Sequence, residues 1–210
     1  MMDLSSNHNR LYYVYDPMCA WCWGYNPTWQ EIVQGLEGKL AIQYVVGGLA
    51  PDSDTPMPLE MREQIASYWR KIENFLGTEF NHDFWTRNTP RRSTYPSCRA
   101  ALAARKQGAE REMISAIQSA YYLEAKNPSD SEVLLDLAST IGLDVDQFKQ
   151  DFESEQLNQE FHEELNFARS IGGNSFPSLF VQTEKGIVEL PIDYQSSATT
   201  LAQIESVISR

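Results

Sequence analysis

Residues 15–24 read YDPMCAWCWG and place two cysteines, Cys19 and Cys22, three positions apart. The residues just before them, 11–15, are aromatic or β-branched and predict a short buried strand. Apolar residues at helical spacing come after them and predict a helix over about residues 19–36. The two cysteines are therefore expected at a junction between a strand and a helix.

The rest of the chain has α/β ends and a helical middle. Further strands are expected at residues 41–46, 178–182 and 186–190, the last two as a hairpin. Helical spacing of apolar residues predicts helices at about 61–75, 95–107, 110–125, 131–141, 146–171 (as one helix or two) and at the C-terminus behind Ser196. Neither end alone makes a complete sheet, so the fold class is α/β with a helical insertion. We expect residues 1–57 and 172–210 to form the sheet domain and 58–171 the insertion domain.

Composition excludes several functions. The 210 residues contain 17 Lys and Arg against 29 Asp and Glu, and a net charge of -12 disfavours a nucleic-acid partner. No stretch approaches the roughly 18 apolar residues of a membrane span, so no membrane partner is expected. Residues 1–10 lack the apolar core of a signal peptide. These observations predict a cytoplasmic protein.

The three cysteines point to thiol chemistry. An odd number leaves one thiol over in any disulfide framework, and a chain of this length can bury a core without disulfides. Cys19 is expected at a helix N-terminus, where unpaired backbone N–H groups stabilise a thiolate. Cys22 lies on the same helical face and can reach the first sulfur. Position therefore predicts Cys19 as the nucleophile and Cys22 as the resolving thiol.

Zinc binding is the alternative for the cysteine pair. Zinc takes four ligands, and the other Cys and His residues of the chain are Cys98, His8, His82 and His162. None of them forms a second pair with ligand spacing, so no metal site is expected. The sequence also contains neither a Rossmann fingerprint nor a Walker A motif. We therefore expect no bound cofactor.

A second motif, GGNSFP at residues 172–177, places Pro177 just before an expected strand. Together with residues 15–24 it resembles the thioredoxin superfamily, specifically its DsbA-like branch. The resemblance covers the whole chain, and Pro27, five residues after Cys22, matches the family's helix-kinking proline. It implies a thioredoxin-like fold interrupted by an all-helical insertion domain.

The resemblance also implies roles for individual residues. Cys19 matches the exposed nucleophile of the family and Cys22 its more buried partner. Pro177 matches the cis-proline that faces the two sulfurs. The backbone of Phe176 would then pair with an extended substrate segment.

Ala20 and Trp21 lie between the cysteines, and the resemblance implies that this dipeptide tunes the sulfur environment and contacts the substrate. The function implied is that of an enzyme, a thiol-disulfide oxidoreductase that oxidises, isomerises or reduces protein and peptide disulfides through its Cys-Ala-Trp-Cys dithiol. Electrons then come from or go to another molecule, and glutathione is a candidate redox partner.

Two departures from the family pattern concern proton transfer. Many superfamily members carry a carboxylate on the first strand, six residues before the nucleophile, and this chain has Tyr13 there. Asp16 is nearer the motif, and we expect it to cap the helix.

Two other functions stay open. Kappa-class glutathione transferases and hydroxychromene-carboxylate isomerases share the inserted helical domain, which allows a glutathione-dependent isomerase or transferase of small aromatic substrates. They usually carry serine in place of the reactive cysteine pair. The third possibility is a non-enzymatic, redox-sensing or metal-binding adaptor.

Three further groups are ambiguous from sequence. Cys98 is expected in the core, with a third redox thiol as the alternative. The aromatic residues Trp21, Trp23 and Tyr25 form either a substrate platform or core. A basic cluster is expected to be solvated surface, with an anion site as the alternative; its members are Arg87, Arg91, Arg92 and Arg99.

Overall fold

The computed structural model describes residues 9–209. Residues 1–8, which make up most of the stretch compared with a signal peptide, lie outside this range. His8, one of the candidate zinc ligands, is among them. The described residues form a four-stranded sheet in the order β2-β1-β3-β4. Its strands are β1 (Arg10–Tyr15), β2 (Ala41–Val46), β3 (Ser178–Thr183) and β4 (Gly186–Leu190). β1 and β2 run parallel, and the other neighbours are antiparallel.

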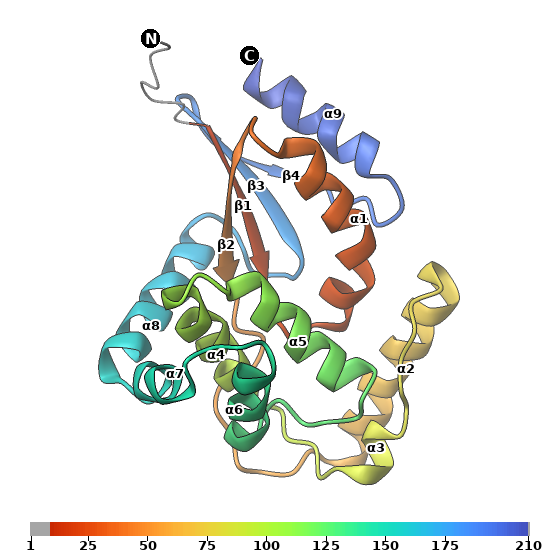
Figure 1. Ribbon diagram of the computed structural model, residues 1–210. Helices are drawn as coiled ribbons and strands as arrows, with labels where there is room; N and C mark the ends of the chain where they lie inside the picture. Colours follow the sequence, from red (N-terminus) through yellow and green to blue (C-terminus); the bar gives the residue numbers. More distant parts are fainter. Residues whose placement is uncertain (1–8, 210) are drawn as a thin grey trace.

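The helices follow the expected order (Figure 1). They are α1 (Ala20–Leu36), α2 (Leu59–Leu76), α3 (Phe84–Arg87), α4 (Tyr95–Lys106), α5 (Glu110–Tyr122), α6 (Ser131–Thr140), α7 (Val145–Phe152), α8 (Glu155–Ser170) and α9 (Ser197–Ile208). The Ser196 hydroxyl caps α9 by accepting from the Thr199 N–H, as predicted. The expected kink at Pro27 stays a prediction. No described helix has both the length and the apolar character to cross a bilayer.

Two helical segments differ from the prediction. The short α3 was not predicted, because four residues carry no measurable periodicity. The predicted helix over 110–125 ends early: α5 stops at Tyr122, and Ala125 has a left-handed φ of 56°. Two asparagine side chains donate hydrogen bonds to backbone carbonyls after α5. Asn81 donates to the Leu123 carbonyl (2.9 Å), and Asn88 donates to the Ala125 carbonyl (2.7 Å). These bonds replace the helical hydrogen bonds that continuation would have supplied.

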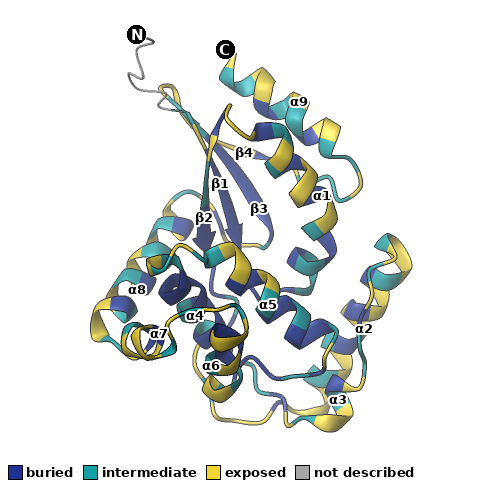
Figure 2. Ribbon diagram, in the orientation of Figure 1, coloured by how far each residue is buried: buried dark blue, intermediate teal, exposed yellow. Residues whose placement is uncertain are grey.

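The central strand β1 is buried on both faces because it is apolar on both (Figure 2), whereas the edge strand β4 is mostly exposed. Leu11, Tyr13 and Tyr15 face the large core cluster that includes α1 and α9 residues. The alternate residues Tyr12 and Val14 belong to a second cluster that includes α8 residues. Side chains alternate along a strand, so the two helical layers follow from the sequence of β1.

The large cluster continues from the sheet into the helices of the middle segment. Trp69 of α2 is fully buried, with ring centroids 5.0 Å from Phe80, 5.8 Å from Phe84 and 5.3 Å from Tyr122. The strands lie at residues 10–46 and 178–190, with helices only between them. The division into two domains at residues 57/58 and 171/172 stays a prediction, since the core is continuous across it.

Candidate redox site

The cysteine pair lies where β1 gives way to α1. Cys19 is the N-cap residue of α1, and Cys22 lies in its first turn. The Cys19 N–H donates to the Asp16 carbonyl (3.0 Å), and the Cys19 carbonyl accepts from the Trp23 N–H (3.1 Å). All three cysteines of the chain are free thiols. The structure therefore holds the pair at the predicted strand–helix junction, in the dithiol form.

Cys19 is less accessible than the family resemblance implies. It is 6% exposed and Cys22 is 1% exposed, so the expectation of an exposed nucleophile is wrong, although Cys19 is the more exposed of the two. The Cys19 Sγ donates to the Phe176 carbonyl oxygen at 3.4 Å. The loop that carries Phe176 thus sits against the sulfur.

The predicted proline loop meets the cysteines. It joins α8 to β3, and its Phe176–Pro177 peptide bond is cis. Pro177 is buried and Phe176 is half-buried. The Cys19–Phe176 contact joins residues 157 positions apart in the chain. That both residues bind substrate stays a prediction.

Gly47 and Arg169 hold the Phe176 ring in place, and sequence reasoning missed both. A Cβ on Gly47 would lie 1.9 Å from Phe176 Cε1, so only glycine leaves room for the ring. The Arg169 guanidinium lies 5.8 Å from the centre of that ring. It also donates to the Gly47 carbonyl (2.7 Å) and to the Gly173 carbonyl (3.1 Å). The Gly47–Gly48 pair after an expected strand was the only sequence signal for this feature. It does not reveal the contact between Gly47 and Phe176, because the two residues lie far apart in the chain.

Replacing Gly47 by alanine is expected to impair the site. The new methyl group would push the Phe176 ring away and move the carbonyl that binds the Cys19 thiol. We expect the rate of disulfide exchange with a peptide substrate to fall by about tenfold or more, because small misplacements of a reacting group are costly. Stopped-flow measurement of the exchange rate tests this.

Gly142→Ala is the matched control for this change. Gly142 has a left-handed φ of 81° and open space around its Cβ position. Its replacement should lower stability by about 1 kcal/mol and leave the exchange rate unchanged. An unchanged rate for Gly47→Ala as well would show that the position of the Phe176 ring does not affect disulfide exchange.

Burial governs the titration of the groups near the sulfurs. It raises the pKa of Cys22 well above the usual thiol range, and the hydrogen bond and charge of Cys19 add to the shift. Burial likewise raises the pKa of Tyr13, whose ring stacks on Trp29 with centroids 4.1 Å apart. Tyr13 therefore keeps its proton at neutral pH and does not replace the carboxylate that the family resemblance would place at this position.

Asp16 is a buried junction and not the helix cap that we expected. It is 0% exposed; Oδ1 accepts from the Met18 N–H (2.8 Å), and Oδ2 accepts from the Leu49 N–H and the Thr94 hydroxyl (2.6 Å each). α1 has Cys19 as its N-cap, with no side-chain cap. Burial raises the pKa of Asp16, and these hydrogen bonds oppose part of the shift. The Asp16 carboxylate thus joins the loop before the cysteines to the segments that carry Leu49 and Thr94.

Cys98 is a core thiol beside Asp16. It is 0% exposed, and its Sγ donates to Asp16 Oδ2 at 3.5 Å. Burial, followed by the charge of Asp16, raises the pKa of Cys98 well above its usual range. Both features disfavour the thiolate that a third redox thiol would need.

Cys98→Ala is therefore expected to leave the disulfide exchange rate within about twofold of wild type, while costing about 1 kcal/mol of stability for the lost sulfur contacts. Insulin reduction and urea unfolding measure the two quantities. A tenfold loss of rate at unchanged stability would assign Cys98 a redox role.

The residues between the cysteines, Ala20 and Trp21, are partly exposed, as is Trp23, whereas Tyr25 is buried. Trp21 has its ring 5.1 Å from Tyr194 and 5.9 Å from Lys71 Nζ. Trp23 stacks on Tyr122, and Tyr25 is fully buried. Of the three aromatic residues weighed as a platform, Tyr25 is core. Contact of Ala20 and Trp21 with substrate stays a prediction.

The arginine cluster is largely neutralised. Three of its members pair with carboxylates: Arg87 with Asp83, Arg91 with Asp130 and Arg99 with Asp52. Within residues 9–209, no three His, Cys, Asp or Glu side chains converge as metal ligands would. His82 instead binds the Glu73 carboxylate at 3.0 Å.

Comparisons with known proteins agree with this geometry. A family model described as Thioredoxin matches residues 12–190. The ClpXP adapter protein SpxH of Halalkalibacterium halodurans is 27% identical over 151 residues, 69% of this chain and 49% of the relative. SpxH of Bacillus subtilis is 25% identical over 174 residues, 81% of this chain and 57% of the relative. The chain thus spans about half the length of the curated relatives it matches.

Solved structures show the same fold. A candidate protein disulfide isomerase from Nitrosomonas europaea has a TM-score of 0.83 at 25% identity, covering 95% of this chain and 96% of that one. The cytosolic disulfide reductase DsbM of Pseudomonas aeruginosa has a TM-score of 0.73 at 24% identity, covering 94% of both chains, and its structure with GSH also matches. Pseudomonas aeruginosa DsbA has a TM-score of 0.59 at 14% identity, covering 99% of this chain and 86% of that one. The predicted α/β class and DsbA-like fold are confirmed.

Proposed function

We propose that this chain, which belongs to the thioredoxin family, is a thiol-disulfide oxidoreductase that acts on protein and peptide disulfides. One observation carries the proposal: the Cys19 thiol, at the N-terminus of α1, contacts the Phe176 carbonyl of the proline loop at 3.4 Å. A reactive sulfur and a backbone able to pair with a peptide therefore share one site.

In the reducing direction, the Cys19 thiolate attacks one sulfur of a substrate disulfide. The substrate S–S bond breaks, and a mixed disulfide between Cys19 and the substrate forms while the other substrate sulfur leaves as a thiolate. Cys22 then attacks the Cys19 sulfur, the mixed disulfide breaks, and the second substrate sulfur is released as a thiolate that takes a proton from solvent. Two electrons have passed to the substrate, and the Cys19–Cys22 disulfide remains. The same steps in reverse oxidise a substrate dithiol.

The proton for this cycle comes from Cys22. Burial raises the pKa of Cys22, so Cys22 is still a protonated thiol when the mixed disulfide between Cys19 and the substrate forms. Tyr13 is neutral, and the Asp16 carboxylate faces Met18, Leu49 and Thr94. The substrate thiolate expelled in the first step is then the base. It takes the proton of Cys22 and diffuses away as a thiol, while the Cys22 thiolate becomes the nucleophile.

Substrate would approach from the proline loop. Cys19 donates to the Phe176 carbonyl in the free protein, so a peptide sulfur that reaches Cys19 displaces this contact. The freed carbonyl then accepts from the N–H of an extended substrate, in the manner of an added strand. Ala20 and Trp21 follow Cys19 in the chain and are partly exposed, so they would contact side chains of the peptide.

The oxidised pair must be reduced again by another thiol, and we propose glutathione. The solved structure of DsbM with GSH supports this choice by likeness of fold. The reaction closes with two glutathione thiols giving two electrons and one glutathione disulfide.

An adaptor is the second candidate. SpxH proteins, which match this chain at 25–27% identity, carry the name of ClpXP adapters. In that case the fold would present a surface to a partner protein without turning over disulfides.

Insulin reduction and refolding of a scrambled disulfide protein, each with glutathione as reductant, distinguish these functions. We expect rates well above that of glutathione alone, and no such excess for the Cys19→Ser/Cys22→Ser double variant. Faster refolding identifies an isomerase, and faster insulin reduction alone a reductase. Equal rates with and without the protein would favour the adaptor, and glutathione turnover with small aromatic substrates only would favour the isomerase or transferase alternative.

A further inference from the structure

The outer edge of β2 is open over half its length. β2 pairs only with β1 among the described strands, and the Gly47 N–H just beyond it points to the Tyr15 carbonyl of β1. Backbone groups alternate in direction along a strand, so those of Ile42, Tyr44 and Val46 point away from the sheet. This edge is where another strand would be added.

Side chains cover the C-terminal half of this edge. The Val46 N–H donates to Glu164 Oε1 (2.7 Å), and the Tyr44 carbonyl accepts from Arg105 Nη2 (3.1 Å). Arg105 is itself neutralised by Glu110 and Glu164, each at 2.6 Å. Such covering protects an edge strand from unwanted pairing.

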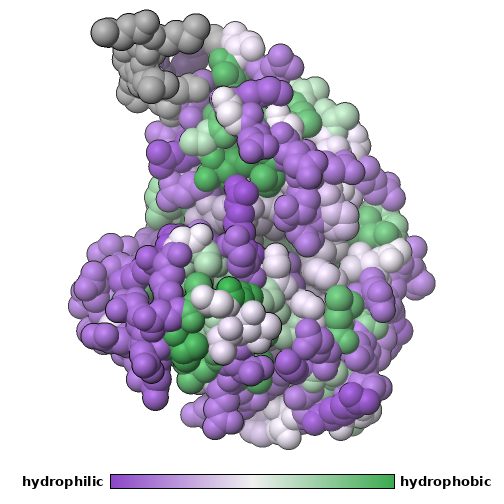
Figure 3. Space-filling model, in the orientation of Figure 1, coloured by the Kyte–Doolittle hydropathy of each residue, from purple (hydrophilic) through white to green (hydrophobic). Residues whose placement is uncertain are grey.

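The N-terminal half has no such cover. In the described part of the chain, nothing binds the N–H or carbonyl of Ile42 or the N–H of Tyr44. A cavity of about 570 Å³ runs along this half, lined by Ala41–Tyr44 on one side and by Gly108, Glu110, Arg111 and Glu112 on the other. Figure 3 shows hydrophobic surface over this part of β2, with hydrophilic residues around it.

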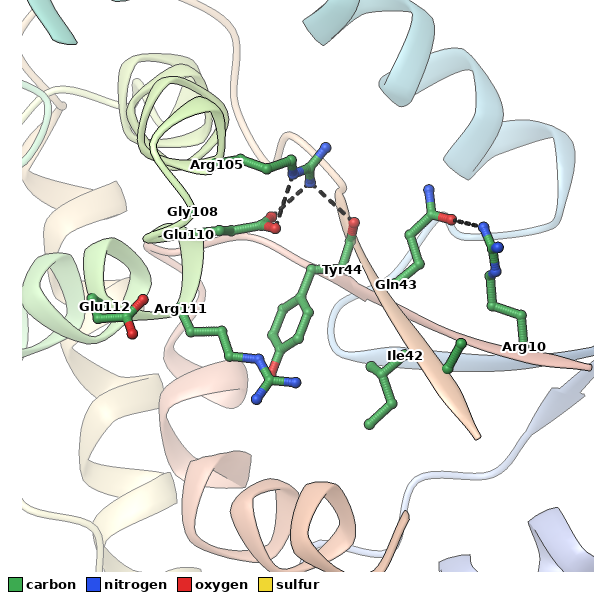
Figure 4. A pocket seen from close by; sticks show the side chains of 10 residues that line it. Arg10, Ile42, Gln43, Tyr44, Arg105, Gly108, Glu110, Arg111 and Glu112 are labelled. Carbon is green, nitrogen blue, oxygen red and sulfur yellow. Dashed lines mark hydrogen bonds and ion pairs between the residues drawn. The ribbon is translucent and has the colours of Figure 1, made fainter. Parts of the chain in front are cut away.

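Two arginines flank this open half from opposite faces of the sheet (Figure 4). Arg10 Nη1 donates to Gln43 Oε1 at 2.7 Å, and the Arg111 guanidinium lies 5.2 Å from the centre of the Tyr44 ring. Gln43 and Tyr44 are consecutive in β2, so their side chains point to opposite faces. Neither arginine has a carboxylate partner within residues 9–209, in contrast to Arg105.

We propose that the open half of β2 binds an extended acidic peptide segment of a partner protein, which adds to the sheet as a fifth strand. In a parallel arrangement, one peptide residue opposite Gln43 donates to the Ile42 carbonyl and accepts from the Tyr44 N–H. The peptide carbonyl two residues earlier accepts from the Ile42 N–H. All three open backbone groups are then paired.

Charge selects the peptide. Adjacent side chains of an added strand point to opposite faces, so two consecutive acidic residues reach Arg10 and Arg111 at once. Apolar neighbours in the peptide suit the hydrophobic surface around Ile42. This edge lies at the Arg10 end of β1, whereas the cysteines follow its Tyr15 end. Binding is therefore independent of the thiols.

Fluorescence anisotropy with a fluorescein-labelled acetyl-VEEVEV-amide peptide tests the proposal. We expect saturable binding that weakens about tenfold or more for Arg10→Glu and for Arg111→Glu, and measurably for Arg111→Gln. Arg70→Glu, on the remote helix α2, is the matched control and should bind as wild type. The Cys19→Ser/Cys22→Ser variant should also bind normally, which separates this proposal from the proposed function.

Backbone pairing has its own readout. Amide hydrogen exchange at Ile42 and Tyr44 should slow when the peptide is bound, and backbone N-methylation of the peptide should abolish binding. A VKKVKV peptide of equal affinity, binding without protection of the two amides, or full affinity of the N-methylated peptide would each overturn the proposal. Self-association that the Arg10→Glu and Arg111→Glu variants dissolve would identify a second copy as the occupant and equally overturn it.

Discussion

Cys19→Ser is expected to lower the rate of disulfide exchange by about a thousandfold or more, because a serine hydroxyl at neutral pH is neither ionised nor able to form a stable bond to sulfur. Cys19 contacts the Phe176 carbonyl, so the substituted hydroxyl can keep that hydrogen bond. The fold should therefore survive the change. Insulin reduction, measured against the rate of the reductant alone, gives the size of the loss.

Cys22→Ser is the matched partner of this variant. It keeps the nucleophile and removes the thiol that resolves the mixed disulfide. We expect one equivalent of substrate to accumulate on Cys19, detectable by mass under non-reducing conditions, and none on the Cys19→Ser protein. Substrate captured on Cys22 in the Cys19→Ser protein would reverse the assigned roles.

Asp16→Ala is expected to destabilise the protein by about 3 kcal/mol, because it leaves the Met18 and Leu49 N–H groups buried without an acceptor. The Thr94 hydroxyl would lose its short bond as well; it would still accept from the Ala50 N–H (3.0 Å) but could donate only to the Ala50 carbonyl at 3.4 Å. Urea unfolding measures the change. Asp83→Ala removes an exposed carboxylate that pairs with Arg87 and should cost less than about 1 kcal/mol.

The pH dependence of this difference has a definite sign. Burial raises the pKa of Asp16 in the folded protein above its value of about 4 in the unfolded chain. The folded state then favours the protonated form, so the stabilisation by Asp16 is full below pH 4 and declines as pH rises through the raised pKa. The difference in free energy of unfolding between wild type and Asp16→Ala should be larger at pH 4 than at pH 8. A gap that widens with pH would show that the carboxylate is stabilised as an anion.

Much of the fold could be predicted from residue type in β1 and from apolar spacing in the helices. The aromatic and β-branched run at residues 11–15 is a continuously buried strand, and the cysteine helix shows the apolar spacing that its burial requires. The hairpin after Pro177 was recognisable from its turn and its β-branched residues, although β4 is mostly exposed. α5 was predicted too long, since the asparagines that end it come from a distant segment. Local spacing does not report such contacts.

The candidate site was only partly predictable for the same reason. The two cysteines and Pro177 belong to local motifs, so their meeting could be expected from the resemblance. Gly47 and Arg169 act through the Phe176 ring, which lies far from Gly47 in the chain. Asp16 looked like a helix cap by position, and only the three-dimensional contacts with Leu49 and Thr94 show a buried junction instead.

The most direct test is the thiol state of the protein equilibrated across a series of glutathione redox buffers. Alkylation, digestion and mass spectrometry report which cysteines are oxidised at each potential. A reversible Cys19–Cys22 disulfide that forms in one two-electron step, with Cys98 remaining a thiol throughout, is the predicted result. Cys19 and Cys22 that stay reduced across the whole series, or a disulfide that includes Cys98, would contradict a redox-active pair at the start of α1.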